Sequence, residues 1–286
     1  MKGRIVKGVG GLYTIDTAEG IYTGNPRGIF RLENIKPLIG DFVEIEITHE
    51  QDRECAINEI YPRKNEMIRP SVSNIDQVFI VFSIKNPKIN FDLLDRFIIL
   101  AESKKMEITL CFNKLDLSKE KDTEDLKKIY GDLYNIIFLS TYNAIGLDKI
   151  KEYSKNKVSV FAGPSGVGKS SIINYILPEA NMEIGEISKK IKRGKHTTRH
   201  VELHSIDKNS YIIDSPGFTS LNFENIDIYN LKDYFVEFRN YDNCQFRDCM
   251  HNKEVDCAIK NEVGKNISKK RYYRYLQFLE MLEKGK

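Results

Sequence analysis

Residues 1 to about 67 alternate apolar and polar side chains in short runs. The alternation predicts strands at 3–9, 12–16, 28–32, 41–48 and 55–60. Turn signals such as Gly10-Gly11, Gly24-Asn25-Pro26 and Gly40-Asp41 separate these runs. Short strands at this density are typical of a small closed or nearly closed β barrel, and the OB fold is the natural candidate.

The periodicity changes in residues 68–222. Continuous apolar runs at 78–82, 108–112, 136–139 and 158–162 are typical of buried strands, and a further strand is expected at 211–213. Helical spacing at 91–102, after a possible N-cap at Asn90, at 120–130 and at 147–153 alternates with them. Strands that alternate with helices indicate a parallel sheet in a three-layer α/β fold.

The last part of the chain, residues 223–286, is expected to be mostly α-helical, with a helix at 268–283. Tyr272, Tyr275, Leu276 and Leu279 would form its packing stripe. The sequence thus predicts a multidomain α/β protein with domains at 1–67, 68–222 and 223–286.

Composition narrows the classes of function. The 286 residues are 41% hydrophobic and 30% charged, with a net charge of +3, so any surface for nucleic acid must be local. No apolar run approaches the roughly 18 residues of a membrane span, and residues 1–7 do not resemble a signal peptide. We therefore expect a cytoplasmic protein without a membrane partner.

Cys55 and Cys111 are isolated and are expected to be buried, reduced thiols.

The apolar run 158–162 leads into a glycine-rich loop, Gly163-Pro-Ser-Gly-Val-Gly-Lys-Ser170, and then into a predicted helix. This spacing is that of a phosphate-binding loop, in which backbone N–H groups surround a phosphate at a helix N-terminus. Lys169 would reach the β- and γ-phosphates, and the Ser170 hydroxyl would bind Mg²⁺. The residues expected to bind the phosphates are Gly163, Pro164, Ser165, Gly166, Val167, Gly168, Lys169, Ser170 and Ser171.

A second motif, Asn113-Lys114-Leu115-Asp116, follows the strand at 108–112. The Asp116 carboxylate would accept hydrogen bonds from guanine N1–H and the exocyclic amine, a donor pair that adenine lacks. Asn113 would bond the purine edge and hold the loop, and the Lys114 stem would lie on the purine ring. Ser140-Thr141 follows the next strand, where GTPases place a loop whose backbone contacts the base.

Switch elements are expected on either side of the strand at 211–213. One of Thr197 and Thr198, with Thr198 favoured, would complete the Mg²⁺ shell together with Ser170 and Asp214. Asp214-Ser-Pro-Gly217 would hold Mg²⁺ through Asp214 and sense the γ-phosphate through the Gly217 N–H.

The order of these motifs is unusual. Ordinary GTPases place Asn-Lys-x-Asp last, whereas here it precedes the phosphate loop, so the fold is expected to be circularly permuted. Phe218 occupies the position at which many GTPases carry a water-orienting glutamine. His196 is the nearest polar candidate for a catalytic residue, and the alternative is that it binds an RNA phosphate or orders the switch. We expect slow intrinsic hydrolysis that a partner stimulates.

Three cysteines and a histidine cluster in the C-terminal part as Cys244-x₄-Cys249-x-His251-x₅-Cys257. Three sulfurs and one imidazole match a closed, structural zinc site with no open position for water. A segment of this size buries little core, so zinc would supply folding energy.

Two surfaces have open interpretations. In the barrel, Tyr13, Tyr22 and Phe30 could bind RNA together with basic residues, or the rings could fill the core. At the start of the C-terminal helix, cations that include Arg271 and Arg274 could meet a phosphate backbone, or they could form a solvated helix face.

Taken together, the small barrel, the permuted motifs, Gly194-Lys-His-Thr-Thr198, Asp214-Ser-Pro-Gly-Phe218 and the Cys/His spacing closely resemble the ribosome small-subunit-dependent GTPase A family (RsgA, also called YjeQ). The resemblance covers nearly the whole chain and implies an OB barrel, a circularly permuted P-loop GTPase domain and a zinc domain. It implies a GTPase that binds the small ribosomal subunit and its rRNA late in assembly and whose GTP hydrolysis the subunit stimulates. The expected ligands are GTP or GDP with Mg²⁺ and one Zn²⁺, and a monomer is expected.

Two positions depart from the family pattern. Val255-Asp256 stand where Pro-Gly is common, and Arg199 stands where a third threonine is common, which leaves the switch threonine open. Two other functions stay open on the sequence: a signalling GTPase directed at a protein, and an RNA-binding assembly factor whose nucleotide only fixes its shape.

Overall fold

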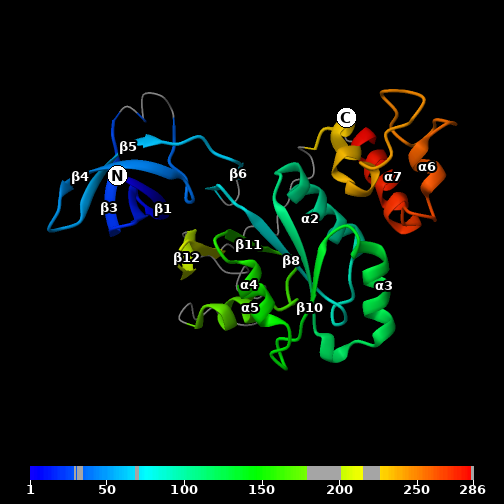
Figure 1. Cartoon of the computed structure of the whole chain (residues 1–286), viewed down its shortest axis with the longest axis horizontal. Helices are drawn as coiled ribbons and strands as arrows, with labels where there is room; N and C mark the ends of the chain where they lie inside the picture. Colours follow the sequence, from blue (N-terminus) through cyan, green and yellow to red (C-terminus); the bar gives the residue numbers. More distant parts are fainter. Residues whose placement is uncertain (29, 31–34, 68–70, 179–200, 215–225, 285–286) are drawn as a thin grey trace.

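The computed structural model describes residues 1–284 except 29, 31–34, 68–70, 179–200 and 215–225 (Figure 1). The barrel lies at one end of the molecule and the C-terminal helices at the other, with the α/β part between them. Among the described residues, no helix is both long and apolar enough to span a membrane.

Five strands form the N-terminal barrel: β1 (Lys2–Val9), β2 (Leu12–Thr17), β3 (Gly20–Pro26), β4 (Phe42–His49) and β5 (Glu54–Ile60). They pair in the order β1-β2-β3-β5-β4, and β4 pairs again with β1, which closes the barrel. The β3–β5 pair is parallel and the other pairs are antiparallel. The predicted OB-type barrel is therefore confirmed.

The third barrel strand differs from the prediction. The structure forms β3 at Gly20–Pro26, where no strand was predicted; of the predicted strand at 28–32, Gly28 lies in a turn, and residues 29, 31 and 32 lie outside the described part. Gly24 pairs with Cys55 of the parallel strand β5, and a Cβ at Gly24 would collide with the Cys55 backbone. A glycine that signals a turn in the sequence is thus required here by close packing inside a strand.

The α/β part is built on parallel strands in the order β10 (Asn135–Phe138), β9 (Glu107–Asn113), β8 (Gln77–Ser83), β11 (Val158–Ala162) and β13 (Ser210–Asp214). The strand β12 (Glu202–Asp207), which the sequence did not predict, pairs antiparallel with β13. It also pairs with β1 at Glu202 and Lys7, so that one continuous sheet connects the α/β part with the barrel. The short strands β6 (Glu66–Met67) and β7 (Val72–Ser73) pair with each other.

Helices cover both faces of this sheet, as predicted. Val78, Ile80 and Phe82 of β8 belong to the core shared with α2 (Phe91–Ser103) and α3 (Glu120–Tyr130). Phe79 and Val81 belong to the core on the other face, shared with α4 (Leu147–Tyr153) and α5 (Lys169–Ile176). The Asn90 side chain accepts a hydrogen bond of 3.0 Å from Leu93 N, which confirms the predicted N-cap.

The C-terminal part contains the 3₁₀ segments η6 (Ile228–Tyr234) and η7 (Val236–Phe238), then α6 (Ala258–Glu262) and α7 (Lys269–Lys284). A further 3₁₀ turn, η1 (Leu115–Leu117), lies within the α/β part. Tyr275 and Leu279 are buried, and Tyr272 and Leu276 pack against the same core, as the predicted stripe requires. That core also includes Ile99 of α2, so the C-terminal part packs directly on the α/β part.

A buried ionic cluster joins α2 to α7, and we call it the Asp95 cluster: Asp95, Tyr130, Glu237, Arg271 and Arg274. Arg271 donates to Asp95 Oδ1 at 2.6 Å and to both Glu237 oxygens at 2.8 and 3.0 Å. Arg274 Nε bonds Asp95 Oδ2, and Tyr130 OH donates to Asp95 Oδ1 at 2.9 Å. Both arginine side chains are at least 90% buried, so neither can meet a phosphate backbone as the sequence had suggested.

Candidate functional site

The glycine-rich loop connects β11 to α5 at the carboxyl edge of the sheet. β11 is buried throughout, and Gly163, Gly166 and Gly168 all have positive φ (138°, 77° and 100°). A Cβ at Gly163 would collide with the Val81 carbonyl of the neighbouring strand β8. The loop therefore needs glycine both for its backbone angles and for its close contact with the sheet.

Lys169 opens α5 and points back over the loop. Its ammonium group donates to the carbonyl oxygens of Gly163 and Pro164, at 2.7 Å each. Burial lowers the pKa of Lys169 to about 8. A phosphate placed in the loop would give this cation a charged partner in place of the two carbonyls.

The guanine motif lies beside the loop, as the parallel strands require. Asn113, fully buried at the end of β9, donates to Val167 O at 2.8 Å and accepts from the backbone N–H of Lys114 at 2.7 Å and of Thr141 at 3.1 Å. One amide side chain thus connects three loops. A Cβ at Gly168 would collide with this amide, so the glycine also permits the contact between phosphate loop and base loop.

Asp116 lies one turn beyond Asn113 in η1. The Ser140 hydroxyl donates to Asp116 Oδ1 at 2.5 Å and accepts from Asn143 N at 3.2 Å. Lys114 has φ 63°, and its ammonium group bonds the carbonyl of Asn86, a contact that the sequence did not predict. An Asn-Pro dipeptide is typical of a turn, but nothing in the sequence pairs Asn86 with Lys114.

The structure brings together some of the predicted nucleotide residues and leaves others untested. Residues 163–171, Asn113–Asp116 and Ser140-Thr141 lie at one edge of the sheet. Asp214 ends β13, the strand parallel to β11, and so lies at the same edge. His196, Thr197, Thr198 and Gly217 lie outside the described residues.

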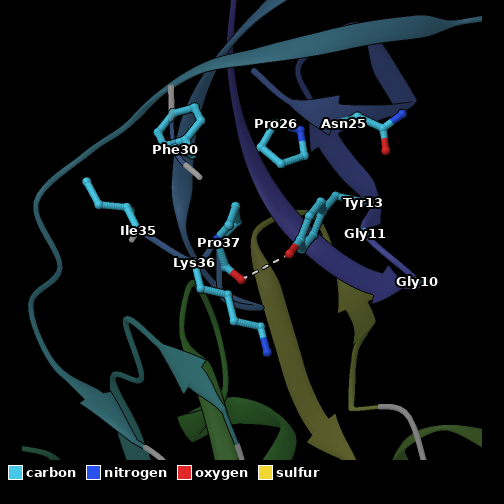
Figure 2. A pocket seen from close by; sticks show the side chains of 9 residues that line it. All are labelled: Gly10, Gly11, Tyr13, Asn25, Pro26, Phe30, Ile35, Lys36 and Pro37. Atoms are coloured by element: carbon cyan, nitrogen blue, oxygen red, sulfur yellow. Dashed lines mark hydrogen bonds between the residues drawn. The ribbon is translucent and has the colours of Figure 1, made fainter. Parts of the chain in front are cut away.

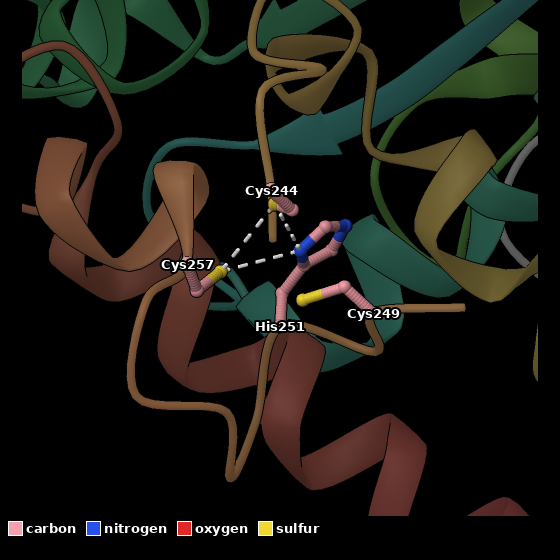
Figure 3. A group of neighbouring side chains, drawn as sticks. All are labelled: Cys244, Cys249, His251 and Cys257. Atoms are coloured by element: carbon pink, nitrogen blue, oxygen red, sulfur yellow. Dashed lines mark hydrogen bonds between the residues drawn. The ribbon is translucent and has the colours of Figure 1, made fainter. Parts of the chain in front are cut away.

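A second site lies in the C-terminal part, where Figure 3 shows the side chains of four residues that lie close together. The ligand atoms of Cys244, Cys249, His251 and Cys257 all lie within 4.8 Å of one another. His251 Nδ1 is 3.6 Å from Cys244 Sγ and 3.3 Å from Cys257 Sγ, and the two sulfurs are 3.9 Å apart. Tetrahedral zinc with ordinary Zn–S and Zn–N bonds requires separations of about 3.5–3.8 Å. The donor set and the spacing fit a metal ion.

Neighbouring side chains fix the turns that carry these ligands. Tyr272 OH donates to His251 O at 2.7 Å, and Lys232 donates to Cys249 O at 3.1 Å. Glu254 accepts from Met250 N and Asn252 N at 2.7 and 2.8 Å. Burial raises the pKa of the Cys249 thiol to about 12, so the thiolate form at neutral pH requires a bound cation.

Cys55 and Cys111 are both buried, as predicted. Burial also raises the pKa of the Cys111 thiol, which is consistent with an inert core residue.

A phosphate loop and a guanine motif that meet at one sheet edge, in reversed chain order, define the circularly permuted GTPases. The comparisons agree with this class. The sequence model of the family described as RsgA GTPase matches residues 60–224, and that of the RsgA N-terminal domain matches residues 2–55.

Full-length relatives and solved structures extend the match. The chain is 42% identical to the small ribosomal subunit biogenesis GTPase RsgA of Alkaliphilus metalliredigens (100% of this chain, 99% of the relative) and 44% identical to that of Caldanaerobacter subterraneus (100% and 97%). The crystal structure of YjeQ from Thermotoga maritima superposes with a TM-score of 0.87 at 34% identity, covering 98% of both chains. That of YloQ, a circularly permuted GTPase, superposes with a TM-score of 0.85 at 35% identity (100% and 96%). The chain belongs to the RsgA GTPase family, and it is a GTP hydrolase.

Proposed function

We propose that this GTPase binds the small ribosomal subunit during its late maturation and that the subunit stimulates GTP hydrolysis. The observation that carries the proposal is the match, over the full chain, to relatives named small ribosomal subunit biogenesis GTPase. On this proposal the protein acts in the cytoplasm, its partners are the subunit with its rRNA and GTP or GDP, and it works as a monomer. Residues 1–67, 68–222 and 223–286 act as three domains.

The nucleotide would occupy the sheet edge at which the phosphate loop and the guanine motif meet. Guanine would pair with Asp116, which Ser140 holds in place, and the phosphates would lie between the loop N–H groups and Lys169. Ser170, Asp214 and Thr198 are the proposed Mg²⁺ ligands, with Thr197 as the alternative to Thr198, and the Gly217 N–H would sense the γ-phosphate. Mg²⁺ would neutralise the charge that develops on the phosphates during hydrolysis.

Catalysis on this proposal depends on the partner. Phe218 follows Gly217 and cannot orient a water molecule, so intrinsic hydrolysis would be slow. His196, from the switch segment, is our candidate for positioning the water once the subunit is bound.

The Cys₃His site would hold one structural Zn²⁺. The support is the spacing of the ligand atoms and the donor set of three sulfurs and one imidazole. Four protein ligands leave no open coordination position, so the ion would stabilise the fold and take no part in hydrolysis.

Co-sedimentation tests the choice of partner. The full chain with a non-hydrolysable GTP analogue is expected to pellet with purified small subunits and not with large subunits, and to remain in the supernatant with GDP. Binding should weaken steeply as salt rises, because contacts to rRNA release counterions. If neither subunit binds the protein, the partner is not the ribosome, and a protein-directed signalling GTPase becomes the better account.

A further inference from the structure

A pocket on the barrel and a pocket beside α3 differ in their surroundings. Figure 2 shows the barrel pocket, of about 450 Å³, with Tyr13 and Phe30 among its lining residues. Both rings are buried in the barrel core, so neither presents an open face to a ligand. The other pocket, of about 290 Å³, lies between α3 and the segment that connects β8 to α2, and its lining includes Lys85, Lys88 and Ile89 of that segment. On the pocket side, this segment is therefore not held by packing.

Hydrogen bonds hold the start of this segment, residues 83–87, which we call the Asn86 turn. The buried Ser83 hydroxyl, at the end of β8, donates to Pro87 O at 2.8 Å and closes the turn. The backbone N–H of Ile84 donates to Asn113 O at 2.9 Å. The turn is thus attached directly to the strand end that carries the guanine motif.

The tip of the Asn86 turn contacts the guanine motif a second time. Asn86 has φ 53°, a conformation that asparagine adopts more readily than most residues, and its carbonyl accepts a hydrogen bond from the Lys114 ammonium group. Beside it, Lys85 pairs with Asp122 of α3 at 2.8 Å. This ion pair fixes the turn on the side that faces α3.

Lys114 is anchored at both ends of its side chain. Its backbone is left-handed, with φ 63°, which is unfavourable for a residue with a Cβ. The Asn113 side chain accepts from the Lys114 backbone N–H at 2.7 Å, and the Asn86 carbonyl holds the ammonium group. Strained residues that several contacts hold in place are typical of functional sites.

We propose that Ser83 is a positioning residue for guanine nucleotides. By closing the Asn86 turn it fixes the carbonyl that holds Lys114, and so keeps the Lys114 stem in place against the purine ring. The inference rests on the proposed nucleotide site, since it names what shapes one wall of the base pocket. A side chain that is already ordered loses less conformational entropy when the base binds, so the fixed stem increases affinity.

A double-mutant cycle on the full chain, measured by GDP titration, tests whether Ser83 acts through Lys114. Ser83→Ala should weaken GDP binding about 3- to 10-fold, which corresponds to one neutral hydrogen bond. Lys114→Met keeps an unbranched stem without the ammonium group, and it should weaken GDP binding about 10-fold or more because a charge-assisted bond is lost. The double variant should bind GDP as Lys114→Met does, whereas a purely structural role of Ser83 would lower the affinity in both backgrounds.

Ser103→Ala is the matched control. The Ser103 hydroxyl also donates to a backbone carbonyl, Leu100 O, at 2.8 Å, but at the far end of α2. Its removal should leave GDP affinity unchanged. If Ser83→Ala does not fold, Lys85→Gln loosens the same turn from its surface side, and it should weaken GDP binding only where Lys114 is present.

Unchanged GDP binding in Ser83→Ala, or losses that add in the double variant, would overturn the inference. Tighter binding would also overturn it, because Asn86 would then hold Lys114 away from the base. Asp116→Ala separates this failure from that of the site. If Asp116→Ala weakens GDP binding and Ser83→Ala does not, only the positioning role fails and the proposed function stands. If Asp116→Ala has no effect, the base binds elsewhere, and the proposed site fails together with the inference.

Discussion

The Asp95 cluster makes a quantitative prediction about how the C-terminal part is held. The cluster contains two carboxylates and two guanidinium groups, so its charges balance. Asp95 is fully buried and supplies one of the two negative charges. Burial alone would lower the pKa of Arg271, and Asp95 and Glu237 outweigh it and hold that pKa well above its ordinary value. Asp95→Ala leaves an uncompensated positive charge inside the protein.

Removing one partner of a buried ion pair costs about 3–5 kcal/mol, mostly because the remaining charge is desolvated and unpaired. We expect Asp95→Ala to destabilise the contact between the C-terminal part and α2 by this amount. The matched control is Glu102→Gln, which breaks the pair between Glu102 and Arg239 (2.8 Å) across the same interface. Because Arg239 is 53% exposed, that pair should contribute at most about 1 kcal/mol.

Native-state amide exchange in residues 226–284 measures both effects, since it reports local opening free energies separately from global unfolding. The opening free energy should fall strongly in Asp95→Ala and hardly in Glu102→Gln. Equal, small effects in the two variants would refute the idea that the buried cluster fixes the C-terminal part on α2.

Three further predictions concern the two sites. Asp116→Ala should weaken GTP binding about 100-fold or more in nucleotide titrations, because two charge-assisted hydrogen bonds to guanine are lost. The weak binding of ATP should not change. An unchanged GTP affinity would contradict the assignment of Asp116 to guanine. Lys169→Met should weaken GTP binding about 10- to 100-fold and GMP binding only slightly in the same titrations, since the ammonium group would contact only the outer phosphates. Equal losses of affinity for both nucleotides would place Lys169 elsewhere. Cys257→Ser, or a strong chelator, should release zinc and increase amide exchange in residues 226–284, while the α/β part stays protected. The zinc site would be excluded if elemental analysis found no metal in purified protein whose residues 226–284 are ordered.

Much of the nucleotide site was predictable because its constraints are local. A phosphate loop needs glycines at fixed spacing after a strand, and the structure has positive φ at Gly163, Gly166 and Gly168. The contact between Asn113 and Val167 is different, since the two residues are 54 positions apart. Two motifs in one parallel sheet could be expected to meet, but not the bond that joins them.

The misplaced and missed features all depend on long-range contacts. Gly24 suggested a turn, and only its pairing with Cys55 explains why it lies inside β3. Arg271 and Arg274 looked like surface cations because Asp95, their partner, is 176 and 179 residues away. The barrel aromatics Tyr13, Tyr22 and Phe30 are at most 9% exposed, which favours the interpretation that they belong mainly to the core.

Steady-state GTP hydrolysis with purified small subunits, with large subunits as the control, tests the central claim most directly. The account predicts slow hydrolysis by the protein alone, strong stimulation by small subunits only, and loss of activity in Lys169→Ala. If small subunits bind the protein but do not accelerate hydrolysis, the nucleotide only fixes the shape of an RNA-binding assembly factor, and a subunit-activated GTPase is contradicted.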